Sequence, residues 1–497
     1  MPDNTPERRF AAYPSAVVYQ EPDGKTPLEH LLWGDYIGVR GRKRGEWFPV
    51  CTRHVKEGWA HEDAIQGERV LEVIFVDIGQ GDGCLVVTPD DKHILIDAGA
   101  NDNFIRFLRW RYPKFAKKRH FEAAVISHPD SDHYAGFKRI FEETNVTFGT
   151  VYHNGIIERT GKKSDSLGPR AKSGKDTFLT EVITNKAELE ELLADPAVSK
   201  KKAYPTMLKD ALATGRVSDI RMLCAADEFM PGYEANKKLS IEVLGPVTEP
   251  DENDQPRLRW FGDPGKTKNG HSVVLRLRYR DVKILLGGDL NIPSEYLLLS
   301  HHTGMEIPPT TAEDERLIVE AARRVFQSDI AKACHHGSAD FSDLYLQSVN
   351  PIATVISSGD DEPHAHPRSD SLGTIGKFSR GARPLIFSTE LSRSASEAIK
   401  NPHLVRESFR DAQRKLEEAV TPAAKEKALK KFNDLVNTIE RSIGVYGAIN
   451  VRTDGHFVVI AYKIERATDK DKQWDIYRLE RTPSEVLHYV SKHEVKH

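Results

Sequence analysis

Residues 128–133 read His-Pro-Asp-Ser-Asp-His, and they follow directly on the apolar run Ala123–Ile126. The run predicts a short buried strand, so the hexapeptide is expected to form a loop at its end. Such a loop can aim several side chains at one point without burying unpaired charge. The side chains of the loop that can bind a metal are His128, Asp130, Asp132 and His133. The sequence therefore predicts a metal site at this strand end.

Two other strand ends carry further metal-binding side chains. Asp289 closes the sequence Leu-Leu-Gly-Gly-Asp, and His335 and His336 follow the run Ala331–Cys334. A bridging carboxylate placed opposite histidines and other carboxylates suits a pair of metal ions about 3.5 to 4 Å apart. We therefore expect a dinuclear site.

The spacing of apolar runs divides the chain into a small all-β unit and a larger α/β unit. Short apolar runs separated by turns predict a small barrel over residues 1–67. Longer buried runs then alternate with helical patterns, which predicts an α/β catalytic domain over residues 68–465. Insertions are expected within it at about 155–235 and 395–442, and residues 466–497 are expected to form a C-terminal extension.

The composition argues against several classes of protein. The chain has 497 residues and a formal net charge of −3, so its overall field gives no reason to expect binding to a polyanion or an anionic membrane. Its four cysteines lie far apart without a CxxC pair, which fits neither a disulfide framework nor a zinc knuckle. No signal-peptide pattern precedes the barrel, and no stretch approaches about 20 apolar residues. We expect a cytoplasmic protein without membrane contact.

A series of short motifs follows the predicted strands. The motifs are Val76–Asp82, Ile96–Gly99, Ser127–His133, Asn269–Val274, Leu286–Asp289, His335–Ser338, and Ser357–Asp360 with His366-Pro367. In this order they resemble the metallo-β-lactamase superfamily, and within it the soluble domain of the ComEC competence-protein family. The resemblance implies an α/β fold, the αββα sandwich, with helical insertions. The short N-terminal strands, ending in Gly58-Trp59-Ala60, are similar to bacterial Src-homology-3-like domains.

The resemblance assigns a role to most of the candidate ligands. It implies that His128 and Asp130 hold one metal ion and that Asp132 and His133 hold the other. It further implies that Asp289 bridges the two ions.

Two further roles concern histidines and proton transfer. Either His335 or His336 would complete the second metal site, and the sequence does not decide between them. The resemblance places His366 near the site, where it can contact a phosphate as a catalytic residue. Asp132 or a nearby histidine is expected to handle the proton.

Two departures from the superfamily's commonest pattern matter. Asp130 stands where that pattern has a histidine, and the added carboxylate shifts the preference from zinc toward manganese or magnesium. The Pro-Gly-His element that many relatives place upstream of the Asp289 position is absent. His153 or His271 can compensate, although a structural role is favoured for each. We expect two divalent ions whose identity stays open.

Cleavage of DNA phosphodiester bonds is the first functional hypothesis. Two cations lower the pKa of a bound water, so that hydroxide can attack phosphorus in line. ComEC-like domains are regarded as DNA-degrading nucleases. Basic clusters at Lys117–Arg119, Lys162-Lys163 and Lys200–Lys202 can contact a nucleic-acid backbone, although solvated surface is the commoner role of such runs.

Two alternative functions stay open. A hydrolase of a small phosphoester, nucleotide or lactone would use the insertion at 155–235 as a lid. A partner-binding component of a multi-protein system would instead dock other proteins through the barrel or through the charged helical hairpin at 402–442. The apolar stripe of that hairpin would also serve a homodimer contact.

Overall fold

The computed structural model describes residues 5–79, 81–160, 165–199, 202–359, 364–393, 402–442, 445–483 and 486–492. Gln80 and Asp360 of the motifs above lie outside these residues, as do Lys162-Lys163 and Lys200-Lys201 of the basic clusters. Within the described ranges, no helix is long and apolar enough to cross a lipid bilayer.

The N-terminal strands form an antiparallel sheet of their own, in the order β3-β2-β6-β5-β4-β1-β7. Its strands are β1 (Glu7–Ala11), β2 (Ser15–Tyr19), β3 (Pro27–Leu32), β4 (Tyr36–Val39), β5 (Trp47–Cys51), β6 (Gly58–His61) and β7 (Ile65–Gln66). Small and β-branched residues such as Val18, Ile37 and Val50 pack in its interior. The expected small all-β unit is present and is barrel-like.

The larger unit contains a ten-stranded sheet in the order β15-β12-β11-β10-β9-β8-β24-β25-β26-β27. Its strands are β8 (Leu71–Phe75), β9 (Gly83–Val87), β10 (His93–Ala98), β11 (Arg119–Val125), β12 (Val146–His153), β15 (Val217–Met222), β24 (Ile449–Thr453), β25 (Val458–Lys463), β26 (Trp474–Arg481) and β27 (Leu487–Val490). Strands β10, β11, β12 and β15 run parallel to one another. The ranges expected as an insertion and as a C-terminal extension thus supply edge strands, β15 at one edge and β26 with β27 at the other.

A six-stranded sheet in the order β16-β19-β20-β21-β22-β23 faces the first. Its strands are β16 (Leu239–Gly245), β19 (Val274–Tyr279), β20 (Val282–Leu286), β21 (Ile330–Lys332), β22 (Ala353–Ile356) and β23 (Leu385–Ser388). Strands β20 to β23 are parallel. A small separate sheet contains β13 (Arg170–Ser173), β14 (Asp176–Leu179), β17 (Glu249–Pro250) and β18 (Pro256–Arg259).

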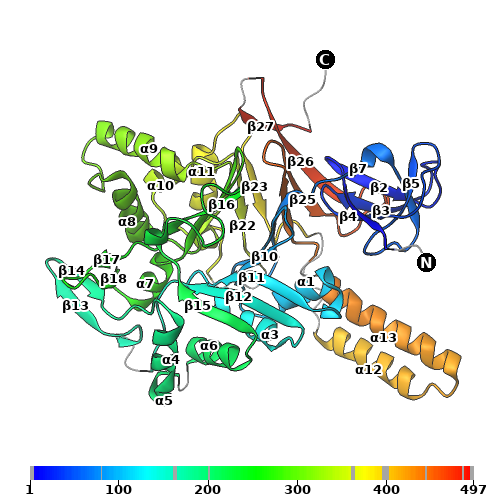
Figure 1. Ribbon diagram of the computed structural model, residues 1–497, viewed down its shortest axis with the longest axis horizontal. Coiled ribbons are helices and arrows are strands. Elements are labelled where there is room, and N and C mark those ends of the chain that lie inside the picture. The colour runs from blue at the N-terminus through cyan, green and yellow to red at the C-terminus, as the bar shows by residue number, and fades with distance from the viewer. Residues whose placement is uncertain are drawn as a thin grey trace.

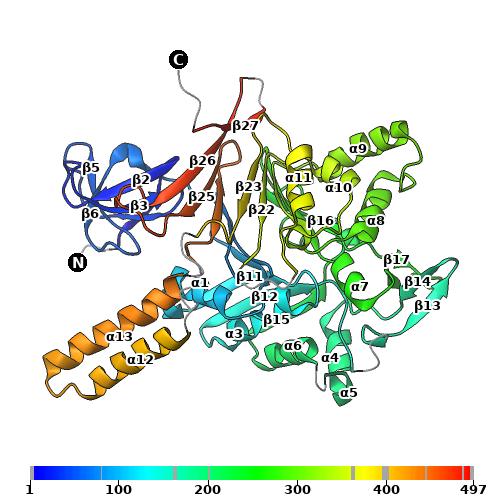
Figure 2. The same cartoon turned by 180° about the vertical axis from the view of Figure 1, so that it is seen from behind.

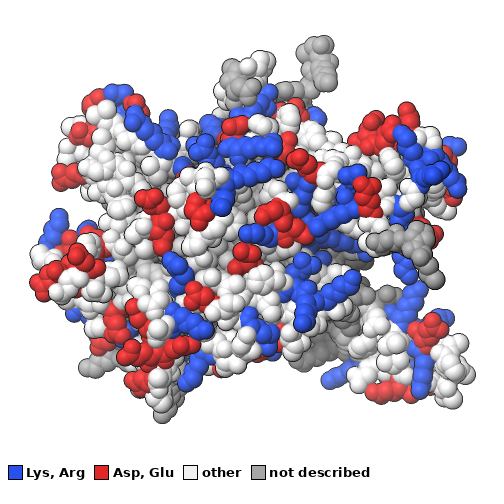
Figure 3. All heavy atoms as spheres, in the orientation of Figure 1, with Lys and Arg blue, Asp and Glu red and all other residues white. Residues whose placement is uncertain are grey.

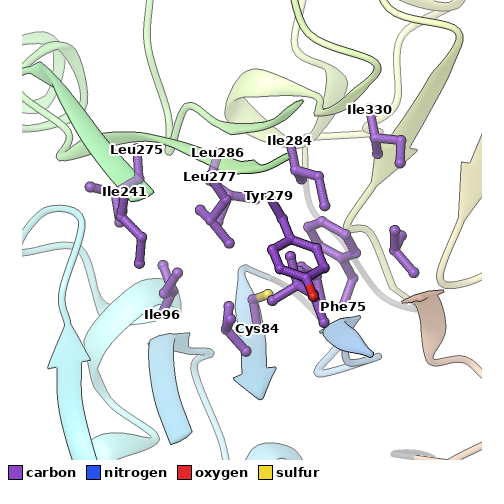
Figure 4. Packing of buried hydrophobic residues seen from close by; sticks show 14 of the residues in the cluster. Phe75, Cys84, Ile96, Ile241, Leu275, Leu277, Tyr279, Ile284, Leu286 and Ile330 are labelled. Atoms are coloured by element: carbon purple, nitrogen blue, oxygen red, sulfur yellow. The ribbon is translucent and has the colours of Figure 1, made fainter. Parts of the chain in front are cut away.

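Apolar side chains from the two large sheets meet between them. Figure 4 shows Phe75, Cys84 and Ile96 of the ten-stranded sheet opposite Leu277 and Ile284 of the six-stranded sheet. The outer face of the ten-stranded sheet packs against α1, α3, α4 and α6, and that of the six-stranded sheet against α8, α9 and α10 (Figure 1). The predicted αββα sandwich is therefore confirmed.

Thirteen α-helices lie within the described residues. They are α1 (Asn103–Arg111), α2 (Ser131–Tyr134), α3 (Phe137–Glu142), α4 (Lys186–Ala194), α5 (Pro196–Ser199), α6 (Ala203–Ala213), α7 (Pro264–Gly270), α8 (Ile292–Thr303), α9 (Ala312–Phe326), α10 (Asp343–Val349), α11 (Ser369–Phe378), α12 (Pro402–Glu417) and α13 (Pro422–Ser442). Figures 1 and 2 show α12 and α13 as a hairpin that projects from the sandwich beside α1. The expected helical hairpin is thus present, and it projects from the sandwich as an arm.

Candidate metal centre

Three strand ends supply the candidate metal centre. β11 leads through a short loop into α2, β20 leads into a Gly-Gly-Asp turn, and β21 leads into a His-His-Gly turn. Loops that follow the carboxyl ends of parallel strands gather at one edge of a sheet. The side chains that these three loops bring together are His128, Asp132, His133, Asp289 and His336.

The carboxylate of Asp289 lies at the middle of the cluster. Its Oδ2 atom is 3.2 Å from Nε2 of His133 and 3.2 Å from Nε2 of His336. Nε2 of His336 is also 3.7 Å from Oδ2 of Asp132. The ring of His128 packs on that of His133, with 4.0 Å between the two centroids. One carboxylate is thus placed between two sets of ligand atoms, which is the arrangement a bridging ligand requires.

Three buried imidazole nitrogens in the cluster make no hydrogen bond of normal geometry, although two of them lie 3.2 Å from Oδ2 of Asp289. They are the Nε2 atoms of His128, His133 and His336, whose side chains are at most 3% exposed. Leaving such a group unsatisfied costs about 1–3 kcal/mol, so native proteins rarely do so without a ligand. Imidazole and carboxylate together form a donor set for transition-metal ions. The residues therefore fit divalent metal ions.

The opposite ring nitrogen of His133 is fixed by a carboxylate that does not belong to the ligand loops. Nδ1 of His133 is 2.9 Å from Oδ2 of Asp97, whose Oδ1 accepts a hydrogen bond of 2.8 Å from the backbone N–H of Ser127. A carboxylate in this position orients the imidazole and raises its basicity toward a metal. Burial opposes a charged ring here, but Asp289 and Asp97 raise the pKa of His133 well above its usual value.

Asp130 lies at the side of the cluster and is paired with a lysine. Its Oδ2 atom is 3.7 Å from Nε2 of His128, while Oδ1 forms an ion pair with Lys268 of α7. Lys268 also pairs with Glu158 at 3.2 Å. Burial raises the pKa of the Asp130 carboxyl even though Lys268 opposes the rise. Asp130 is therefore close enough to His128 to share a cation with it, at the cost of its pairing with Lys268.

The structure separates the two histidines between which the sequence leaves a choice. His336 belongs to the cluster, whereas Nε2 of His335 lies 3.5 Å from the side-chain amide of Asn269. The ring of His335 packs edge-on against His366, with 5.5 Å between centroids. His335 and His336 both have left-handed backbone conformations, with φ of 49° and 53° respectively. Non-glycine residues adopt this conformation at an energetic cost, and it turns neighbouring side chains in different directions.

His153 and His271 do not join the cluster. Nδ1 of His153 accepts a hydrogen bond of 3.0 Å from the backbone N–H of Gly155. Nε2 of His271 lies 2.7 Å from the carbonyl oxygen of Arg259, and its ring stacks on Phe261. Burial lowers the pKa of each to about 4. Both are placed as neutral structural histidines, and neither supplies the ligand missing from the Pro-Gly-His position.

Sequence reasoning missed two charged residues of the centre, Asp82 and Lys332. Oδ1 of Asp82 is 3.3 Å from Nδ1 of His336, and its carboxylate pairs with the buried ammonium of Lys332. Nζ of Lys332 is also 3.5 Å from Oδ1 of Asp289. Gly81 has φ of +103°, and a Cβ there would collide with the carbonyl oxygen of Asp132, so the glycine-rich turn sits directly on the ligand loop. The glycine-rich turn is the sequence signal that could have identified Asp82. Lys332 lies in an apolar strand, and no sequence signal marks it as part of the centre.

The carboxylates of the centre determine its protonation. Burial opposes a charged ring at His336, but Asp289 and Asp82 outweigh it and raise its pKa to about 10. Burial likewise favours a neutral Asp289, yet His133 and His336 hold the pKa of that carboxyl well below its usual range. Protons on these imidazoles occupy the positions that a cation would take.

Comparison with known proteins identifies a family for the part of the chain that carries this centre. The model of the metallo-beta-lactamase superfamily matches residues 83–338, which include the ligand loops after β11, β20 and β21. No curated protein matches the chain significantly.

Three solved structures illustrate the structural matches. Tm1679, a metal-dependent hydrolase of the beta-lactamase superfamily, shares 12% identity over 64% of this chain and 95% of that chain, with a TM-score of 0.29. A variant of the CmlA beta-hydroxylase shares 10% over 61% of this chain and 49% of that chain, with a TM-score of 0.29. The metallo-beta-lactamase MIM-1 from Novosphingobium pentaromativorans shares 12% over 61% and 87%, with a TM-score of 0.23.

TM-scores this low add no argument of their own, so the assignment depends on the family model. That model covers residues 83–338 of 497, slightly more than half of the chain. The chain therefore belongs to the metallo-beta-lactamase superfamily.

Proposed function

We propose that this protein is a metal-dependent phosphodiesterase of the ComEC-like type that cleaves DNA. The observation that carries the proposal is Asp130, which lies 3.7 Å from a ring nitrogen of His128. Together with Asp132 and Asp289 it makes the donor set rich in carboxylate oxygen. Oxygen-rich sites favour harder cations such as manganese and magnesium, and these are the cations commonly paired with phosphate substrates.

Divalent ions in this centre would polarise a phosphoryl oxygen and lower the pKa of a water molecule. The protein's own residues bind and orient the substrate. His335, His366 and Lys268 lie beside the cluster and can donate hydrogen bonds to phosphate oxygens. In this proposal Asp132, whose Oδ2 lies 3.7 Å from Nε2 of His336, accepts a proton from the attacking water.

Support for the finer assignment comes from the order of the motifs and from the N-terminal barrel. The Asp-for-His change at Asp130 is shared by ComEC-like members. The barrel is a small antiparallel unit of short strands, and we include a kinship with Src-homology-3-like modules in the proposal.

Substrate assays on manganese-loaded and zinc-loaded protein test the proposal. We expect cleavage of bis(p-nitrophenyl) phosphate and of single- or double-stranded DNA, with manganese at least as effective as zinc. Asp289→Asn removes the central carboxylate and should lower the rate by about a thousandfold. Asp411→Asn is the matched control, because Asp411 is a carboxylate on α12 whose ion pairs with described residues are to Arg414 and Lys415 of its own helix.

Two other outcomes of these assays would each favour one of the alternative functions. Cleavage of bis(p-nitrophenyl) phosphate, a nucleotide or a lactone with DNA left intact would indicate a small-molecule hydrolase. Full inactivity of both the unchanged protein and Asp289→Asn on every ester, with metal bound to the former, would overturn an enzymatic function and favour a partner-binding role.

A further inference from the structure

A second pocket lies where the barrel, α1 and the ten-stranded sheet meet. Its walls come from β3 and β4 of the barrel, from α1, and from β24 and the start of β26, and none of its lining residues belongs to the candidate metal centre. Its volume of about 50 Å³ accommodates a few water molecules or one compact anion. Figure 3 shows Lys and Arg atoms in the recess between the barrel and the arm formed by α12 and α13.

Cationic side chains outnumber carboxylates in the lining of this pocket. The cationic residues are Arg53, Arg111, Arg452 and Lys463, and the acidic residues are Glu29 and Asp35. One further carboxylate, that of the fully buried Glu72, lies underneath and pairs with both Arg111 and Arg452. The groups around the cavity therefore keep a net positive charge.

The two acidic residues of the lining are already engaged. A carboxylate oxygen of Glu29 accepts a hydrogen bond of 2.5 Å from Thr52 Oγ1. Asp35 accepts a hydrogen bond of 2.9 Å from the backbone N–H of Leu32, and it pairs with Arg452 at 3.3 Å. Little acceptor capacity is left for the remaining donors.

Several donors around the pocket are left without an acceptor. The Nε atoms of Arg111 and Arg452 are buried and have no hydrogen-bond partner, and these side chains are only 5% and 1% exposed. The guanidinium of Arg53 makes no hydrogen bond or ion pair with any residue that the structure describes. The buried Nε donors of Arg111 and Arg452 require an acceptor, and the exposed guanidinium of Arg53 can supply further donors beside them. Guanidinium groups match the geometry of phosphate oxygens.

We infer that this pocket binds a phosphate group and that the bound group links the barrel to the catalytic unit. Arg53 reaches the pocket from the barrel, whereas Arg111 comes from α1 and Arg452 from β24. One anion between them joins three segments that are distant in the sequence. Because such an anion binds only the docked arrangement, it stabilises that arrangement by mass action. The site is independent of the proposed phosphodiesterase activity.

Titration of metal-free protein with inorganic phosphate tests the inference. Tryptophan fluorescence is a direct readout because Trp110 and Trp474 line the pocket. Sodium chloride of equal ionic strength is the blank, and a chelator with Asp289→Asn as a parallel background removes any contribution of the metal centre. We expect saturable binding that is about tenfold weaker in Arg53→Gln, a loss of about 1.4 kcal/mol, because one charge-assisted hydrogen bond is removed.

The matched control is Arg40→Gln, because Arg40 is another exposed barrel arginine that does not line the pocket. It should bind phosphate as the unchanged protein does. Phosphate should also raise the Tm of the unchanged protein more than that of Arg53→Gln. Equal affinity in Arg53→Gln and Arg40→Gln, or no saturable binding in the unchanged protein, would overturn the inference.

A competition arm identifies the source of the phosphate. AMP carries its phosphate as a monoester, and its base would have to extend out of the cavity. Displacement of inorganic phosphate by AMP would support the site and indicate that its ligand is the phosphate group of a larger molecule. Failure of AMP to displace bound phosphate would support the site with free phosphate as its ligand.

Discussion

His133 and His336 each lie between carboxylates, so in the metal-free protein their pKa values are raised, that of His336 to about 10. Both are therefore protonated at pH 7, whereas a metal ligand must be neutral. Metal binding is expected to release about two protons at pH 7, and its affinity should increase with pH by up to about a hundredfold per unit.

Calorimetric titration with manganese in buffers of different ionisation enthalpy measures this release. His153→Gln is a suitable control because that buried histidine lies outside the cluster and its pKa is lowered to about 4. A proton release close to zero at pH 7 would contradict the assignment of both histidines as ligands.

Glu295 is a second residue whose environment predicts a pH effect. It lies on α8, is fully buried, and accepts a 2.6 Å hydrogen bond from the backbone N–H of Ser342. Burial raises its pKa from 4.5 to about 8. The folded protein therefore holds this proton more tightly than the unfolded chain, so the stability it provides is complete below pH 4.5 and is lost as pH rises toward 8.

Glu295→Gln keeps the acceptor and removes the titration. The unfolding free energy of this variant relative to the unchanged protein should rise by about 1 kcal/mol per pH unit between pH 5.5 and 8. Urea denaturation at several pH values measures the difference, with the exposed Glu320→Gln on α9 as the control. A difference that stays constant with pH would refute the raised pKa.

At the scale of elements, β8 is tied to α1 and β24 through one buried carboxylate. Glu72 of β8 lies 2.7 Å from Nη2 of Arg69 and 2.9 Å from Nη1 of Arg452, and it also pairs with Arg111 of α1. The pKa of this carboxyl is far below its usual range because the surrounding arginines, chiefly Arg111, Arg452 and Arg69, outweigh the effect of burial. The carboxylate thus holds three elements against one another.

Glu72→Gln should lower the free energy of unfolding by about 3–5 kcal/mol, because it leaves buried guanidinium groups without a counter-ion. Chemical denaturation at pH 7 measures the loss. Glu68→Gln, four residues earlier and with a side chain 83% exposed, should change stability by less than about 1 kcal/mol. Equal stability of the two variants would show that the arginines find other partners.

The ligand loops could be predicted from sequence because each motif follows an apolar run that becomes a strand. The choice between His335 and His336 could not, since it depends on two consecutive left-handed backbone conformations, which are uncommon for any residue other than glycine. The sequence did not identify Lys332 as a buried residue, because a lysine inside a strand is predicted to lie on the exposed face of an alternating pattern. Its burial depends on Asp82 and Asp289, which come from other loops.

At the scale of the whole molecule, the barrel is docked on the αββα sandwich by contacts that no local pattern shows. Trp33 and Leu32 pack with Val459 and Ala461 of β25, and the side chain of Arg452 donates to the carbonyl oxygen of Trp33 at 3.4 Å. More than 400 positions separate these partners in the chain. Sequence spacing predicts the barrel as a unit but carries no information on where it sits.

Trp33→Ala tests whether this docking couples the two units. Trp33 is 2% exposed, so its truncation should lower the free energy of unfolding by about 3–5 kcal/mol and weaken the packing between the barrel and the sandwich. Scanning calorimetry of the unchanged protein should show one transition, because the barrel and the sandwich share a buried surface. The variant should show an earlier, separate transition of the barrel.

Trp59→Ala, in the same barrel but outside the interface cluster, should keep a single transition. One transition at an unchanged temperature in Trp33→Ala would mean that the barrel is held by its polar contacts, chiefly Arg452 with Asp35, and not by apolar packing.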